Sequence, residues 1–180
     1  MDCPFDCPFL QEARKHEHTE PVDPNQFPNQ DIRVTEEFLG EHEPLLVSVM
    51  GSLMLAAFDT PGAVDRDVRD ALDALIRTQR TLQSGVYYET RPENALANRI
   101  FSETQTGLEE FRKKESEELG MAHTRDADML GVLVFLQRLA LDRNNGRPRG
   151  RAFLDSLRGF LSEAEGAVPP TPGTSSLILP

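Results

Sequence analysis

Apolar residues recur every three or four positions over much of the chain, which is the spacing of one face of an α-helix. The clearest stripe lies between residues 64 and 82 and consists of Val64, Val68, Leu72, Leu75, Ile76 and Leu82. Charged residues fill the other face, where Asp65 precedes Arg69 and Asp73 precedes Arg77 by four positions, in the order that stabilises a helix. We therefore predict an amphipathic helix whose acidic face meets water.

Capping signals predict where two of the helices start. Thr60 followed by Pro61 is typical of an N-cap and a first helical position, so we predict that the helix through residues 64–82 starts there. Thr90 with Glu93 three residues later is a capping box, which predicts the start of a third helix that runs to Phe111 and continues into a charged, solvent-exposed end at residues 109–118.

The stretch from Leu45 to Phe58 is almost wholly apolar, and Pro44 before it suits the first turn of a helix. This pattern predicts a central, buried helix. Gly51 and Ser52 in its middle indicate a point where a neighbouring helix comes close. The run is about 14 residues long, whereas roughly 20 are needed to cross a bilayer, so we do not expect a membrane span.

Two more helices follow, and a short turn precedes the set. A fourth helix, capped near Thr124, is predicted to be the second buried one, with the apolar residues Met129, Leu130, Leu133, Val134, Leu136 and Leu141. A fifth helix carries Phe153, Leu157, Phe160 and Leu161 on one face. At the other end, residues 35–40 are typical of a single helical turn closed by Gly40.

These elements predict an all-α fold, namely an antiparallel bundle of four main helices over roughly residues 44–142 with a shorter fifth helix packed across it. Because the connections are short, we expect helices that are neighbours in sequence to be antiparallel neighbours in space. We assign residues 35–166 to the bundle domain, residues 1–34 to an extended, Pro-rich arm, and residues 167–180 to a Pro-rich flexible tail with the apolar end Leu177-Ile178-Leu179.

Charge and composition narrow the function classes. The chain of 180 residues has a formal net charge of −11 and no Trp, so the core is built mainly from aliphatic residues and Phe, and general binding to nucleic acid or anionic membranes is disfavoured. The first residues do not resemble a secretion signal or a transit peptide, so we expect a cytoplasmic protein.

The arm repeats a four-residue unit, Asp-Cys-Pro-Phe, which places Cys3 and Cys7 four positions apart. With His16 and His18 they supply four ligands of the kind that a zinc site uses, although the two histidines point to opposite sides of any regular element. The Cys-Pro dipeptides also resemble short haem-regulatory motifs, which implies a cysteine thiolate on haem iron. Redox chemistry of the cysteine pair, and plain packing of the arm against the bundle, remain alternatives.

A second candidate site is a cluster of arginines before the last helix. Its members are Arg143, Arg147, Arg149 and Arg151, and only a few acidic residues stand nearby in the sequence. Because a helix starts here, free backbone N–H groups and guanidinium groups have the means to bind a phosphate or carboxylate. The alternative is a solvated loop whose arginines pair with the acidic faces of other helices.

The sequence contains no nucleophile elbow, phosphate-binding loop, dinucleotide fingerprint or zinc-protease motif. We therefore expect a non-catalytic helical module that binds a partner protein or another copy of itself. Zinc binding by the arm and anion binding by the arginine loop are the alternative functions. The tail end, Leu177 to Pro180, is a candidate recognition segment.

Overall fold

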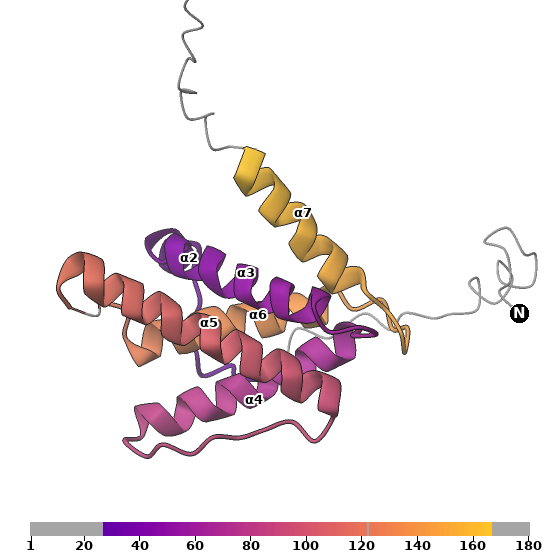
Figure 1. Ribbon diagram of the computed structural model, residues 1–180, viewed down its shortest axis with the longest axis horizontal. Coiled ribbons are helices and arrows are strands. Elements are labelled where there is room, and N and C mark those ends of the chain that lie inside the picture. Colours follow the sequence, from indigo (N-terminus) through magenta and orange to yellow (C-terminus); the bar gives the residue numbers. More distant parts are fainter. Residues whose placement is uncertain (1–26, 122, 167–180) are drawn as a thin grey trace, which may run out of the picture.

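The computed structural model describes residues 27–121 and 123–166, with side chains up to residue 160. Over this range it is all α-helical and contains no strand, which confirms the predicted fold class (Figure 1). The helices are α2 (Glu36–Glu41), α3 (Glu43–Phe58), α4 (Asp65–Gln83), α5 (Ala95–Leu119), α6 (Asp126–Asp142) and α7 (Ala152–Gly166). Gly40 lies inside α2 and does not close it, because the helix continues to Glu41.

The bundle pairs alternate helices, and the prediction that sequence neighbours pack together as antiparallel partners is wrong for most of them. The most extensive contacts join α3 to α5 and α4 to α6, followed by α4 to α5. The cause is the extended connection 84–94, which runs back along α4 (Figure 1). Tyr88 meets Thr81, and Asn94 reaches Asp67 near the start of α4. Helix α5 therefore begins beside the beginning of α4, and these two helices run in the same direction.

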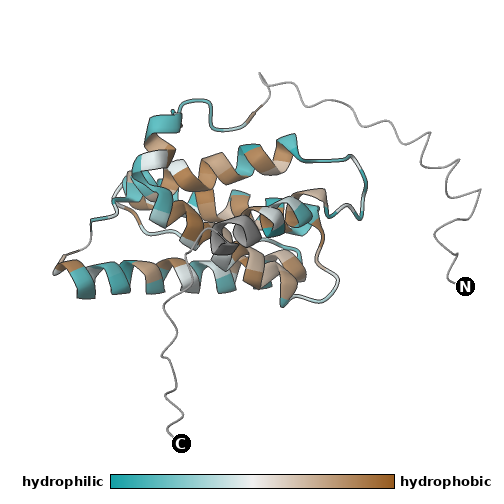
Figure 2. Ribbon diagram, turned by 90° about the horizontal axis from the view of Figure 1, so that it is seen from above, coloured by the Kyte–Doolittle hydropathy of each residue, from teal (hydrophilic) through white to brown (hydrophobic). Residues whose placement is uncertain are grey.

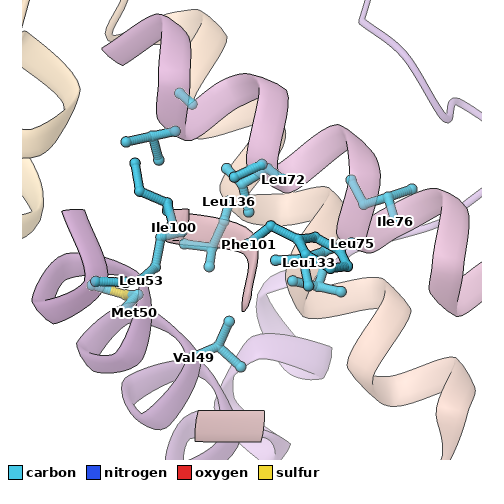
Figure 3. Packing of buried hydrophobic residues seen from close by; sticks show 14 of the residues in the cluster. Val49, Met50, Leu53, Leu72, Leu75, Ile76, Ile100, Phe101, Leu133 and Leu136 are labelled. Carbon is cyan, nitrogen blue, oxygen red and sulfur yellow. The ribbon is translucent and has the colours of Figure 1, made fainter. Parts of the chain in front are cut away.

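The core lies between α3, α4, α5 and α6 and is closed at one end by α7. Figure 3 shows its centre, where residues of all four helices point toward one another: Val49, Met50, Leu53, Leu72, Leu75, Ile76, Ile100, Phe101, Leu133 and Leu136. The helices carry long hydrophobic segments, whereas the connections and helix ends are mostly hydrophilic (Figure 2). Burial of these aliphatic and Phe side chains is the main force that holds the bundle together.

Helix α3 approaches α5 at a point that the sequence indicated. A Cβ atom on Gly107 would clash with the side chain of Ser52, so only glycine fits on α5 at this crossing. Gly51 plays no part in this contact, since a Cβ there would meet nothing within 4 Å. The close approach predicted for this part of α3 is thus confirmed, and Ser52 is the residue that makes it.

Both predicted helix starts are wrong by about one turn. Thr60 ends α3, because its hydroxyl donates to the Ala56 carbonyl at 2.7 Å, and α4 begins only at Asp65. The N-cap of α5 is Asn94, whose side chain accepts a hydrogen bond from the Leu96 N–H at 2.8 Å. Thr90 belongs to the extended connection, where its N–H donates to Thr78 Oγ1 on α4 at 3.0 Å.

The acidic face predicted for α4 is only partly exposed to water. Asp73 and Arg77 form the expected ion pair at 2.8 Å. Asp65, in contrast, is 2% exposed, and its two carboxylate oxygens each accept a backbone N–H, from Phe153 and Leu154, at 3.1 Å. Asp65 therefore caps α7 and is not an exposed partner of Arg69. Burial raises the pKa of Asp65 above 3.8, although the two hydrogen bonds lower it.

The described end of the N-terminal arm is fixed to the bundle by polar contacts. Asn29 adopts a positive φ of 60°, and its side chain binds Gln137 at 2.7 Å and Arg80 at 2.7 Å. Arg138 donates to the Asn29 and Ile32 carbonyls at 2.7 and 2.9 Å. Ile32 and Val34 pack against the core. Residues 27–34 thus join α4 and α6 to the chain that precedes them.

No helix of the described part of the chain is both long enough and apolar enough to span a bilayer.

Candidate binding groove

An apolar groove of about 250 Å³ opens between α4, α5 and α6. Its floor is formed by buried side chains from the three helices, Leu75, Leu108, Met129 and Leu133. Leu82 on α4 is half-buried at its edge. The floor exists because α4 and α5 run side by side and α6 crosses behind them. We call this cavity the α4–α5–α6 groove.

A polar network lies along one side of the groove. Asp126, the first residue of α6, accepts hydrogen bonds from Arg112 Nη2 at 2.7 Å and from Gln79 Nε2 at 3.0 Å. Arg112 Nε is buried and has no hydrogen-bond partner among the described residues. A buried donor without a partner is costly, so an acceptor group delivered to this side of the groove would be stabilised.

Tyr87 forms the other side. Its ring is 61% exposed and lines the groove, while its hydroxyl donates to Glu89 at 3.0 Å. That hydrogen bond raises the pKa of Tyr87 above 10 and lowers the pKa of Glu89 below 4.5. Tyr88 beside it is also largely exposed on the connection 84–94.

A second, more polar cleft of about 210 Å³ lies where α2, α3, α5 and α6 meet. His42 hydrogen-bonds the Phe38 carbonyl through Nδ1 at 2.9 Å, and its Nε2 lies 3.5 Å from Asp128 Oδ1. His42 is the residue between α2 and α3: its ring contacts the Phe38 carbonyl at the end of α2, and it makes no side-chain cap hydrogen bond to the start of α3. Glu115 accepts from Thr124 N and Oγ1 at 2.8 and 2.9 Å. The carboxylates of Glu115 and Asp128 thus already accept hydrogen bonds from backbone N–H groups at the start of α6.

Burial and hydrogen bonding act in opposite directions on these carboxyl groups. Burial raises the pKa of Glu115, but hydrogen bonds from Thr124 and His123 outweigh it and hold that pKa below 4.5. Hydrogen bonds from Arg125 lower the pKa of Asp128 below 3.8. Within the part of the chain that the structure describes, no three His, Cys, Asp or Glu side chains are grouped so as to hold a metal ion.

The predicted arginine cluster is spread over the α6–α7 connection and the start of α7. Arg143 pairs with its neighbour Asp142 at 3.6 Å, and Arg151 lies over the ring of Phe58 with Cζ 5.2 Å from the ring centroid. Arg147 and Arg149 lie on the connection, where both are exposed. The structure does not gather the four residues around one point, and anion binding by them stays a prediction.

The backbone donors proposed for that anion are already used. The Phe153 and Leu154 N–H groups bind Asp65, and the Gly150 and Arg147 N–H groups bind the Arg147 carbonyl and Asn145 Oδ1. An anion at this helix start would have to displace a buried carboxylate. These four N–H groups are therefore not free to bind an anion at this helix start.

The predicted metal ligands Cys3, Cys7, His16 and His18 lie outside the described residues, as does the tail from 167 to 180. Zinc binding therefore remains a prediction. Sequence reasoning missed the α4–α5–α6 groove, because it depends on α4 and α5 running in parallel. The exposed Tyr87 beside Leu82 was the one local signal for it.

Comparison with protein-family models, with curated protein sequences and with solved structures gave no match to this chain.

Proposed function

We propose that the chain is a non-catalytic helical module that binds a partner protein by taking one or two of its bulky apolar side chains into the α4–α5–α6 groove. The observation that carries this proposal is the groove itself, whose floor of Leu75, Leu108, Met129 and Leu133 faces an opening to solvent. Apolar surface that stays open in the monomer gains free energy when a partner covers it.

The size of the groove favours side chains over a cofactor. Sites for drug-sized ligands and cofactors enclose about 300–1,000 Å³, whereas this groove measures about 250 Å³. That space suits one large or two medium apolar side chains of a peptide segment. A helical segment would present such side chains at positions i and i+3 or i+4.

Polar side chains at the edge of the groove support recognition of the backbone or of polar residues in a bound peptide. The unpartnered Arg112 Nε provides a donor on one side, and Gln105 provides an amide that makes only long contacts of 3.4 and 3.5 Å to Glu109 and Tyr87. Weakly engaged donors of this kind are available to the carbonyl groups of a bound segment.

Selection from a library of random peptides tests the proposal directly, because the peptides that bind show which side chains the groove prefers. Short random peptides would be selected on the immobilised full chain, and an enriched peptide would be labelled and titrated by fluorescence anisotropy. Leu82→Glu places a charge at the half-buried edge of the groove and should weaken binding at least about tenfold, equivalent to about 1.4 kcal/mol. Enriched peptides should carry bulky apolar residues.

Leu55→Glu is the matched control, because Leu55 is an exposed leucine on α3 that does not line the groove. It should leave the affinity for the peptide unchanged. The proposal is contradicted if no peptide is enriched, or if Leu55→Glu weakens binding while Leu82→Glu does not. Circular dichroism of both variants would show that each retains the helical fold.

A further inference from the structure

Helix α3 is apolar on all sides, but this chain buries only one of them. Leu45, Val49 and Leu53 point into the core, whereas Leu55, Val47 and Phe58 on the opposite side are 60%, 40% and 39% exposed. The exposed side continues through Gly51 and the half-buried Met54. A helix that is hydrophobic all round is normally covered all round. We call the exposed side, Val47, Gly51, Met54, Leu55 and Phe58, the α3 face.

The centre of the α3 face permits another helix to come close. A Cβ on Gly51 would meet nothing within 4 Å, so the backbone there is open to an approaching helix. Small residues let helix backbones approach each other closely. Helix α7 meets this face only near Phe58, because it diverges from α3 and from the rest of the bundle along its length (Figure 1).

The two ends of the α3 face carry opposite charges. Glu43 lies one turn before Val47, and its side chain is exposed. At the other end Arg151 and Arg158 both lie over the ring of Phe58, with Cζ 5.2 and 5.9 Å from its centroid. Asp155 is on the same helix, but neither arginine forms an ion pair with a side chain that the structure describes.

We propose that the α3 face is the interface of a homodimer, in which α3 packs antiparallel against α3 of a second copy. From Glu43 to Phe58 the helix rises about 22 Å, at 1.5 Å per residue. In a two-fold antiparallel arrangement, the acidic end of each copy meets the basic end of the other, and Gly51 lies near the symmetry axis. The same contact is made twice, as in any isologous dimer.

The net charge of −11 does not prevent this association at physiological salt. Charges on exposed surfaces are screened over about 8 Å at 0.15 M ionic strength, so the groups that face each other decide the electrostatics. These are Glu43 at one end and, at the other, Arg151 and Arg158 together with the exposed Asp59 and Asp155 beside them. Because one helix face is smaller than the standard interface of about 800 Å² per partner, we expect a dissociation constant in the micromolar range.

Sedimentation equilibrium of the full chain over a wide range of concentrations tests the dimer. The wild type should fit a monomer–dimer equilibrium, and Leu55→Glu should raise its dissociation constant at least about tenfold by placing two carboxylates in the apolar interface. Leu82→Glu, on the separate α4–α5–α6 groove, should leave the equilibrium unchanged.

A charge exchange tests the antiparallel arrangement. Glu43→Arg alone and the double variant Arg151→Glu with Arg158→Glu should each dimerise more weakly than the wild type, because both ends of the interface then face like charges. An equimolar mixture of the two should restore association, since each end of the mixed dimer again pairs acid with base. In a parallel arrangement like charges would already face each other in the wild type, so the separate variants would dimerise no more weakly than it does, and their weakening is what identifies the antiparallel orientation.

Three results would overturn the proposal: a wild type that stays monomeric at every concentration, a dimer that Leu55→Glu leaves intact, or a mixture that associates no better than its components. A dimer that is lost on deletion of Leu177 to Pro180 but kept in Leu55→Glu would also overturn it, and would assign self-association to the tail.

Discussion

Asp65 connects two helix starts that lie far apart in the sequence. It begins α4, and its carboxylate holds the first N–H groups of α7 at 3.1 Å from a nearly fully buried position. Asp65→Ala should therefore lower the free energy of unfolding by about 2 kcal/mol, because hydrogen bonds to a buried charged group are lost and two N–H groups are left unpaired. Urea unfolding followed by circular dichroism measures this change.

The same substitution elsewhere on α4 is the control for Asp65. Asp73 pairs with Arg77 on the surface, so Asp73→Ala should change the stability by no more than about 0.5 kcal/mol. Equal effects of the two substitutions would mean that the cap on α7 contributes nothing.

Asp128 gives the unfolding free energy a defined pH dependence. Hydrogen bonds from Arg125 hold its pKa below 3.8 in the folded protein, so its contribution is complete above that value and is lost as the pH falls through the lowered pKa. The stability advantage of the wild type over Asp128→Asn should therefore shrink on acidification. A difference that stays constant from neutral pH to below 3.8 would contradict this account.

Asp65 should show the opposite sign in the same titration. Burial raises its pKa above 3.8, so the part of its contribution that depends on protonation is complete below 3.8 and is lost as the pH rises through the raised pKa, while the two cap hydrogen bonds to α7 remain. Local sequence could not predict this contrast. Both residues lie in the first turn of a helix and look alike in the chain, but Asp65 meets the start of α7 and Asp128 meets the side chain of Arg125.

At the scale of elements, Gly107 at the α3–α5 crossing and Gly51, which lies outside that contact, should respond oppositely to a larger side chain. Gly107→Val would force atoms onto Ser52 and should cost about 1–3 kcal/mol. Gly51→Ala meets nothing and should be neutral or stabilising by up to about 1 kcal/mol, since alanine favours the helix. Thermal unfolding at low protein concentration, where the chain is monomeric, compares the two variants. Similar destabilisation by both would refute the crossing.

The helices were predictable because each one keeps an apolar stripe at helical spacing, as in Val68, Leu72 and Leu75. The positions where the helices begin were less predictable. Thr60 and Thr90 both satisfy local capping rules, yet Thr60 bonds back to α3 and Asn94 is the residue that caps α5. The pairing of helices was not predictable from connection lengths, because segment 84–94 is extended and returns along α4.

The whole molecule combines a helical body with an arm that carries the candidate metal ligands. If Cys3 and Cys7 bind zinc with His16 or His18, purified protein should contain about one equivalent of metal, since structural sites bind zinc tightly near neutral pH. Metal analysis of the wild type and of Cys3→Ser measures this. A zinc content that Cys3→Ser leaves unchanged would mean that these ligands are wrong, and a visible absorption band would point to haem.

Removal of the metal should leave the helical circular dichroism signal intact in any case. The apolar stripes that fill the core, from Leu45 onward, lie outside residues 1–26 and supply their own burial. A metal-free protein that lost its helical signal would contradict this and would make the arm part of the core.

The proposed binding site, the α4–α5–α6 groove, is formed by the molecule as a whole and not by any one segment. Its floor comes from three helices and one side from Tyr87 on the connection, so no local sequence motif predicts the groove. From the lack of catalytic motifs, sequence reasoning led to the hypothesis of a helical module with a protein partner. It placed the contact in the termini because apolar residues in a tail are visible in a sequence and a groove between helices is not.

Methyl NMR of the full chain, titrated with a peptide enriched by selection on the wild type, tests the binding-module account most directly. The account predicts concentration-dependent shifts of the methyl groups on the groove floor, those of Leu75, Leu108, Met129 and Leu133, with little change at Leu55. Shifts confined to Leu55 and Val47 on α3, with the groove methyls unchanged, would contradict it.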